Sequence, residues 1–148
     1  MTTTIVQWGT PEPSGGHYCF NLTVNVANNA RFIPTVIVKP SGYIFSAWCF
    51  ETRFHANPTT GSAIDLYHTP LLGGTLTSHG SGIDPPANTY VGSFGVYPTS
   101  NSGQILPLMN IVNTPFDFLP VIKNRTGQTI PANSGTLKCW FYNEKLTN

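Results

Sequence analysis

Charged residues are scarce in this chain. Asp, Glu, Lys and Arg make up 9% of its 148 residues, whereas average soluble proteins contain about 25%. The surface must therefore be built largely from Thr, Ser, Asn, Gly and Pro. The net charge is +1, the seven basic residues are scattered, and residues 1–16 contain neither Lys nor Arg. Because a surface that follows phosphate groups needs clustered cations, this composition argues against nucleic acid as a partner.

Long apolar runs are missing as well. No run approaches the roughly 20 residues that a membrane-spanning helix needs. The chain opens with Met followed by three Thr, which lacks the charged and apolar segments of a secretory signal. We therefore expect no membrane insertion.

Enzyme signatures are also absent. The sequence contains no GxSxG, HExxH, GxxxxGK or GxGxxG motif, and no pair among its six acidic residues stands out as the two carboxylates of a glycosidase. A metal-binding loop cluster is conceivable from His55, Asp65, His68, His79 and Asp84, although separate loop histidines are the favoured interpretation. We predict no catalytic residue, no metal and no cofactor. A hydrolase stays open as an alternative, with no residues selected for it.

Cysteine is limited to Cys19, Cys49 and Cys139. The three cannot all pair within one chain, and their spacings of 30 and 90 residues fit no zinc motif. The favoured interpretation is that they are small buried apolar residues. A disulfide between two of them, or a cross-link between copies of the chain, stays open.

Large aromatic residues are plentiful, with nine Phe, six Tyr and three Trp, which indicates a packed fold. Fourteen Gly and 13 Pro leave no uninterrupted helical pattern. Apolar side chains instead alternate with polar ones, most clearly over residues 18–26 and 43–54, as expected for strands with one buried face. On the second of these segments, Glu51 and Arg53 share the polar face and are expected to form a surface pair.

These patterns predict short strands separated by turns. We expect strands at residues 3–8, 18–26, 35–38, 43–54, 63–67, 75–77, 90–97, 105–112, 116–122 and 136–143, with a hairpin at the LLGGTL segment. Prolines beside several of them indicate edge strands or bulges. Strands at this spacing form a sandwich or a barrel. The predicted core is Phe20, Leu22, Val24, Ile44, Trp48, Phe50, Phe54, Val91, Val96, Leu137 and Phe141.

One domain over residues 1–148 is expected from the length, with residues 1–16 as a docked N-terminal strand or arm. Two loop-rich segments, HANPTTGSAIDLYH and SHGSGIDPPANTY, combine aromatic and polar residues of the kind that sugar-binding sites use. The candidate ligand-binding residues are Tyr67, His68, His79, Asp84, Asn88 and Tyr90. The alternative is that Asn, Gly and Pro occur there only because turns require them.

Uncharged strand faces also suit contacts between identical subunits, because neutral polar groups need only a hydrogen-bond partner when they are buried. The strand pattern, the uncharged surface and the closing segment IPANSGTLKCWFYNEKL together resemble the single jelly-roll modules of viruses and phages, whose architecture tumour-necrosis-factor-like tips share.

This resemblance implies an all-β, jelly-roll-like antiparallel β-sandwich of about 8–10 short strands. It also implies a coat, decoration or receptor-binding protein that forms trimers or larger assemblies. We therefore predict a non-catalytic structural or attachment protein, located in a virion or outside the cell. Its partners would be copies of itself and a host-surface glycan or receptor. The alternative function is a lectin-like carbohydrate-binding module that acts through its loops.

Overall fold

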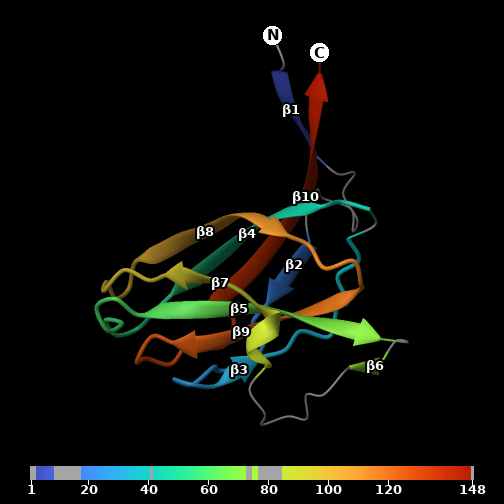
Figure 1. Cartoon of the computed structure of the whole chain (residues 1–148). Coiled ribbons are helices and arrows are strands. Elements are labelled where there is room, and N and C mark those ends of the chain that lie inside the picture. Colours follow the sequence, from blue (N-terminus) through green and yellow to red (C-terminus); the bar gives the residue numbers. More distant parts are fainter. Residues whose placement is uncertain (1–2, 9–17, 41, 73–74, 77–84, 148) are drawn as a thin grey trace.

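The computed structural model describes residues 3–8, 18–40, 42–72, 75–76 and 85–147. Figure 1 shows two antiparallel sheets that face each other. Apolar side chains fill the interior between them. Within the described ranges, no helix is long and apolar enough to cross a membrane. The elements are β1 (Thr3–Trp8), β2 (Tyr18–Asn21), β3 (Arg31–Phe32), β4 (Phe45–Arg53), β5 (Ala63–Leu72), β6 (Thr75–Leu76), the 3-10 turn η1 (Ala87–Thr89), β7 (Tyr90–Gly95), β8 (Gly103–Val112), β9 (Phe118–Arg125) and β10 (Gly135–Thr147).

The strand pairing is nested from the ends of the chain toward its middle. Strand β2 pairs with β10, β3 with β9, β4 with β8 and β5 with β7, always antiparallel. The first sheet has the order β2-β10-β4-β8, with β1 beside the far end of β10, and the second joins β3, β9, β5 and β7, with β6 as a short hairpin on β5. Eight strands paired in this way form a jelly roll, so the predicted fold class is confirmed.

Several strand predictions need correction. The predicted strand at residues 18–26 ends at Asn21, that at 136–143 runs from Gly135 to Thr147, and β3 was not predicted. Residues 35–38 form no strand and contribute only an isolated bridge between Val38 and Phe118. Strand β5 does not end at Tyr67 but continues through Pro70 to Leu72. The Leu71 N–H donates to the Asp117 carbonyl, 2.8 Å away. Because successive N–H groups alternate in direction, the nitrogen of Pro70 faces away from β9. A proline therefore removes no hydrogen bond from the ladder between β5 and β9.

The interior is formed by inward-facing aromatic and aliphatic residues from both sheets. Most predicted core residues are buried, and Val91 and Phe141 are partly buried against the core. Val24 and Ile44 were predicted wrongly, because they are 53% and 57% exposed. Strand β2 ends before Val24 and β4 begins after Ile44, so the alternation seen in the sequence extends beyond the regular ladder. Buried core residues that the prediction missed are Tyr18, Val26, Phe32, Val38, Ile64, Leu66, Phe94, Leu106, Phe118, Ile122 and Ile130.

The outer face of the first sheet carries an ion pair that differs from the predicted one. Lys138 Nζ donates to Glu51 Oε1 at 2.6 Å, whereas Glu51 was expected to pair with Arg53. Glu51 and Lys138 lie on adjacent strands, β4 and β10, at neighbouring register positions, so their side chains can meet diagonally. This outer face therefore carries charged side chains, two of which form an ion pair between adjacent strands.

The three cysteines are free. Cys19 and Cys49 are both register partners of Lys138, from opposite sides of β10. Two strand spacings of about 4.8 Å therefore separate them, which exceeds the roughly 7 Å that a disulfide spans between Cα atoms. Cys139 is buried and faces the interior. Neither exposed-face cysteine can reach another cysteine of the chain without rearrangement of a strand.

The far end of β10 leaves the sandwich as part of a two-stranded ribbon. Tyr142 is the last residue of β10 that pairs with β4, and residues 143–147 pair with β1. The Tyr142 hydroxyl donates to Asn110 Oδ1 at 2.6 Å and its ring stacks on Phe45, with ring centroids 5.5 Å apart. These contacts fix the base of the ribbon. Figure 1 shows that the ribbon projects away from the two sheets.

We predict that a thiol reagent distinguishes the three cysteines in the folded protein. Cys19 is exposed, whereas burial raises the pKa of the Cys49 thiol and raises that of Cys139 well above its usual value. Because the thiolate is the reactive form, Cys19 should be labelled first and Cys139 only after unfolding. Timed labelling followed by peptide mass spectrometry measures this order, and Cys19→Ser should remove the fast phase. Early labelling of Cys139 would contradict the structure.

Candidate binding site

The candidate site lies on the outer face of the second sheet and begins with the alternation of β5. Ile64, Leu66 and His68 face the interior, so Asp65 and Tyr67 face outward. Asp65 is in register with Ser93 of β7, and Tyr67 with Tyr90, after a register shift between Leu66 and Tyr67. Such a bulge redirects the side chains that follow it. The alternation and the bulge together bring the two tyrosines and the carboxylate to one place.

Asp65 is the deepest polar group of this site. It is only 2% exposed, yet both carboxylate oxygens accept hydrogen bonds. Ser93 Oγ donates to Oδ1 at 2.6 Å, and Arg125 Nη1 donates to Oδ2 at 3.1 Å. Ser93 Oγ also lies 2.7 Å from the Tyr90 hydroxyl. A buried carboxylate needs such partners. The Asp65 carboxylate therefore holds the Ser93 hydroxyl and the Arg125 guanidinium in fixed positions, and Ser93 in turn holds the Tyr90 hydroxyl.

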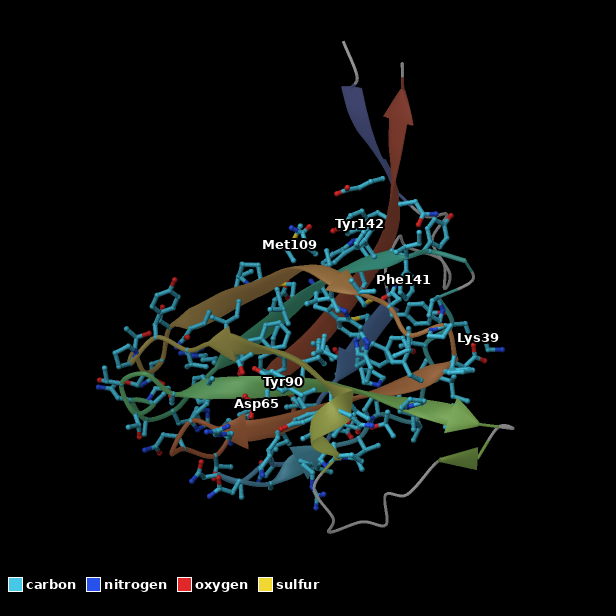
Figure 2. The ribbon with its side chains drawn as sticks, viewed as in Figure 1. Lys39, Asp65, Tyr90, Met109, Phe141 and Tyr142 are labelled. Carbon is cyan, nitrogen blue, oxygen red and sulfur yellow. The ribbon has the colours of Figure 1, made fainter. Side chains whose placement is uncertain are left out.

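The two tyrosines stand beside this network. Their ring centroids are 5.6 Å apart and their planes meet at 69°, an edge-to-face arrangement that aromatic pairs prefer. Tyr90 is 49% exposed and Tyr67 is half-buried. Figure 2 shows Asp65 and Tyr90 close together next to η1. We call Asp65, Tyr67, Tyr90, Ser93 and Arg125 the tyrosine site.

The tyrosine site borders an open pocket of about 330 Å³. Pro85 and Ala87, which lead into and begin η1, form its opposite wall. The charged residues that line this pocket, Asp65 and Arg125, neutralise each other. The hydrogen bond with Asp65 raises the pKa of the Arg125 guanidinium, whose side chain is 61% exposed. The pocket therefore offers ring faces, hydroxyl groups and guanidinium donors without a net charge.

A second pocket, of about 400 Å³, lies on the other side of Tyr90, which lines both pockets. We call it the end pocket. Its polar lining includes Asn88 of η1 and Asn110 of β8. Asn110 has a φ of 58°, a left-handed conformation that asparagine tolerates, and it occupies the register irregularity between β4 and β8. The end pocket thus lies where β7 of the second sheet meets β8 of the first sheet.

His68 lines the end pocket from inside the sandwich rather than from a loop. It is 1% exposed, and its ring centroid lies 3.9 Å from that of Phe118 and 5.1 Å from that of Trp48. Neither ring nitrogen has a hydrogen-bond partner among the described residues. Burial lowers the pKa of this histidine to about 3. His68 is therefore a neutral core residue at physiological pH.

The predicted ligand-binding residues are only partly brought together. Tyr67 and Tyr90 meet in the tyrosine site, and Asn88 and His68 line the end pocket with Tyr90. His79 and Asp84 lie outside the described residues. The sequence analysis did not predict that Asp65, Ser93 and Arg125 belong to this site. A lone aspartate inside the apolar run AIDL was the available signal, because a charge in a buried strand needs a partner.

The conceivable metal cluster is not formed by its described members. His55 is exposed after β4, His68 is in the core, and Asp65 is engaged by Ser93 and Arg125. Among the described residues, no group of three or more His, Cys, Asp or Glu side chains is placed to hold a metal ion.

Comparisons with known proteins give no family. No family model matches the chain, and no curated protein matches it. Among solved structures, it is similar to a carbohydrate-binding module, CBM36, in complex with calcium and xylotriose. The TM-score is 0.42 with 13% identity, over 97% of this chain and 99% of that chain. A likeness of this degree carries no argument for a shared ligand. The resemblance to virion proteins likewise rests on architecture alone.

We predict that His68 makes the folded protein sensitive to acid. Its pKa is about 3 when folded and about 6.5 when unfolded, so between these values only the unfolded state binds the proton. The free energy of unfolding should therefore fall by about 2 kcal/mol from pH 7 to pH 5. His68→Phe should remove most of this loss, whereas His55→Gln, at an exposed position, should not. Urea denaturation at both pH values measures the free energy of unfolding. An equal fall between pH 7 and pH 5 in His68→Phe and in the unchanged chain would contradict the assignment.

Proposed function

We propose that the protein is a non-catalytic carbohydrate-binding module whose ligand lies on the tyrosine site. The observation that carries this proposal is the juxtaposition of two partly exposed tyrosine rings with the Asp65, Ser93 and Arg125 network at one pocket. A sugar ring presents an apolar C–H face and several hydroxyl groups. It therefore needs an aromatic surface and fixed polar groups side by side.

The polar part of the tyrosine site is organised before any ligand arrives. The Tyr90 hydroxyl, Ser93 Oγ and Asp65 Oδ1 form a continuous chain, with separations of 2.7 and 2.6 Å. Because these side chains are already ordered, ligand binding loses little free energy to fixing them in place. The guanidinium of Arg125 is held on the other carboxylate oxygen, which leaves its remaining N–H groups to donate to sugar hydroxyls.

The ligand that fits is an uncharged oligosaccharide. Asp65 and Arg125 cancel within the pocket, so a strongly acidic sugar would meet no excess positive charge from the lining residues. Tyr90 lines both the pocket of the tyrosine site and the end pocket. A chain of two or more sugar rings can therefore contact Tyr67 on one side of Tyr90 and Asn88 on the other.

We expect Tyr67→Ala and Tyr90→Ala each to weaken glycan binding about tenfold, since a lost aromatic contact of this kind is worth about 1 kcal/mol or more. A panel of neutral oligosaccharides identifies a ligand, and calorimetry then measures the affinities. Tyr97→Ala is the matched control, because Tyr97 is 65% exposed and lines neither pocket. Full affinity in both site variants, or no binding across the panel, would overturn the proposal.

A second candidate function is favoured by the ribbon of β1 and β10. In this proposal the protein is a structural or attachment subunit of a virion or a similar extracellular assembly. The jelly-roll architecture and the charge-poor composition suit such a subunit. The specific support is that residues 143–147 and β1 form a sheet segment outside the sandwich, where a neighbouring subunit can contact it. The two functions are compatible in one attachment protein.

This second candidate requires self-association. Light scattering after size exclusion should give a mass well above 16.1 kDa that persists with reductant. Removal of residues 1–8 should reduce the mass of the assembly toward that of one chain, because the ribbon would lose β1. A mass of one chain for the full protein at high concentration, or an assembly unchanged by the deletion, would contradict the candidate.

A further inference from the structure

The direction of the backbone groups in the ribbon follows from two hydrogen bonds of the first sheet. The Leu22 N–H donates to the Gly135 carbonyl at 2.9 Å, and the Arg53 N–H donates to the Ser134 carbonyl at 3.1 Å. Backbone groups therefore point toward β2 at Gly135 and toward β4 at Ser134. This direction alternates along a strand. The backbone N–H and C=O groups of the odd-numbered residues of β10 therefore point toward β2 and β1.

The same alternation carries into β1. Asn143, Lys145 and Thr147 are in register with Gln7, Ile5 and Thr3. These odd-numbered residues of β10 face β1, so each of these pairs exchanges its backbone hydrogen bonds. The backbone groups of Thr4, Val6 and Trp8 then point to the opposite side. Strand β1 is the last strand at this end of its sheet, and no described strand lies beyond it.

We propose that the open edge of β1 pairs with the same edge of a second copy of this chain. The pairing is antiparallel about a two-fold axis at Val6, so that Val6 lies opposite Val6 of the second copy and Thr4 opposite Trp8. The result is a continuous four-stranded sheet with the order β10-β1-β1-β10. This inference is independent of carbohydrate binding, and it supplies the self-association that the second candidate function requires.

Three features of the ribbon select a second copy as the occupant. The three outward-facing residues are spaced symmetrically about Val6, so the edge is complementary to itself, as a two-fold contact requires. Strand β1 contains no charged residue, so no like charges meet across the new pair. A two-stranded ribbon is marginal in water, whereas a larger sheet is stable. Pairing of two copies removes this weakness and covers the open edge of each β1.

The proposed arrangement also avoids collision between the two sandwiches. Trp8 lies at the base of the ribbon, in register with Tyr142, and Thr3 lies near its tip, in register with Thr147. Figure 1 shows the tip projecting away from the sheets. An antiparallel pair places the base of one ribbon at the tip of the other. The two sandwiches therefore lie at opposite ends of a joint sheet about 20 Å long, given about 3.4 Å per residue.

The test uses the full chain and two substitutions at one position. Val6→Pro removes an outward N–H that the ribbon itself does not use, whereas Val6→Thr keeps the N–H and a branched side chain suited to strands. Sedimentation equilibrium over a concentration series should show a dimer of twice 16.1 kDa for the unchanged chain and for Val6→Thr. Val6→Pro should weaken dimerisation at least tenfold. Tyr90→Ala should leave the dimer intact, which separates this inference from the glycan site.

Amide hydrogen exchange gives a second readout that does not depend on the proline variant. The Val6 amide should become more protected as the concentration of the unchanged chain rises, whereas the amide of Phe50, in the middle of the first sheet, should not respond. A monomer at every concentration would overturn the proposal. So would a dimer that survives Val6→Pro, or protection of Val6 that is independent of concentration.

Discussion

Strand β10 is the element on which the first sheet depends, because β1, β2 and β4 all pair with it. Its 13 residues change role along their length. Leu137 and Cys139 face the core, Lys138 bonds Glu51 on the outer face, and Tyr142 anchors the base of the ribbon. A single regular strand thereby ties the packing of the interior to the exposed edge that projects from the fold.

The second sheet organises the tyrosine site through register in a comparable way. A buried carboxylate in a chain with so few charges is stabilised only by partners at fixed distances. Strands β7 and β9 deliver those partners to Asp65 from its two sides, as Ser93 and Arg125. The hydrogen bonds of Asp65 are complete because each partner belongs to a strand of the same sheet. The same pairing makes the site rigid.

Sequence patterns predicted the strands whose alternation is local. The buried face of β4, with Trp48 and Phe50, could be read directly from every second residue, and Tyr67 and Tyr90 could be proposed from their types. Asp65 could not be connected to Arg125, because that contact depends on the pairing of β5 with β9 across 60 residues. His68 was expected in a loop, but β5 continues beyond it, because its pairing with β9 extends from Ala63 to Pro70.

The nested pairing of the jelly roll has a consequence for how the chain is made. Strand β2 bonds to β10 through the contact of Asn21 with Thr136, which are 115 residues apart. During synthesis, β2, β3 and β4 therefore emerge from the ribosome before the strands that pair with them. The first sheet is complete only after β10 has emerged. Pairings of such long sequence separation form slowly. Until then the apolar faces of the early strands are open to other chains, and the scarcity of charge offers them little electrostatic repulsion.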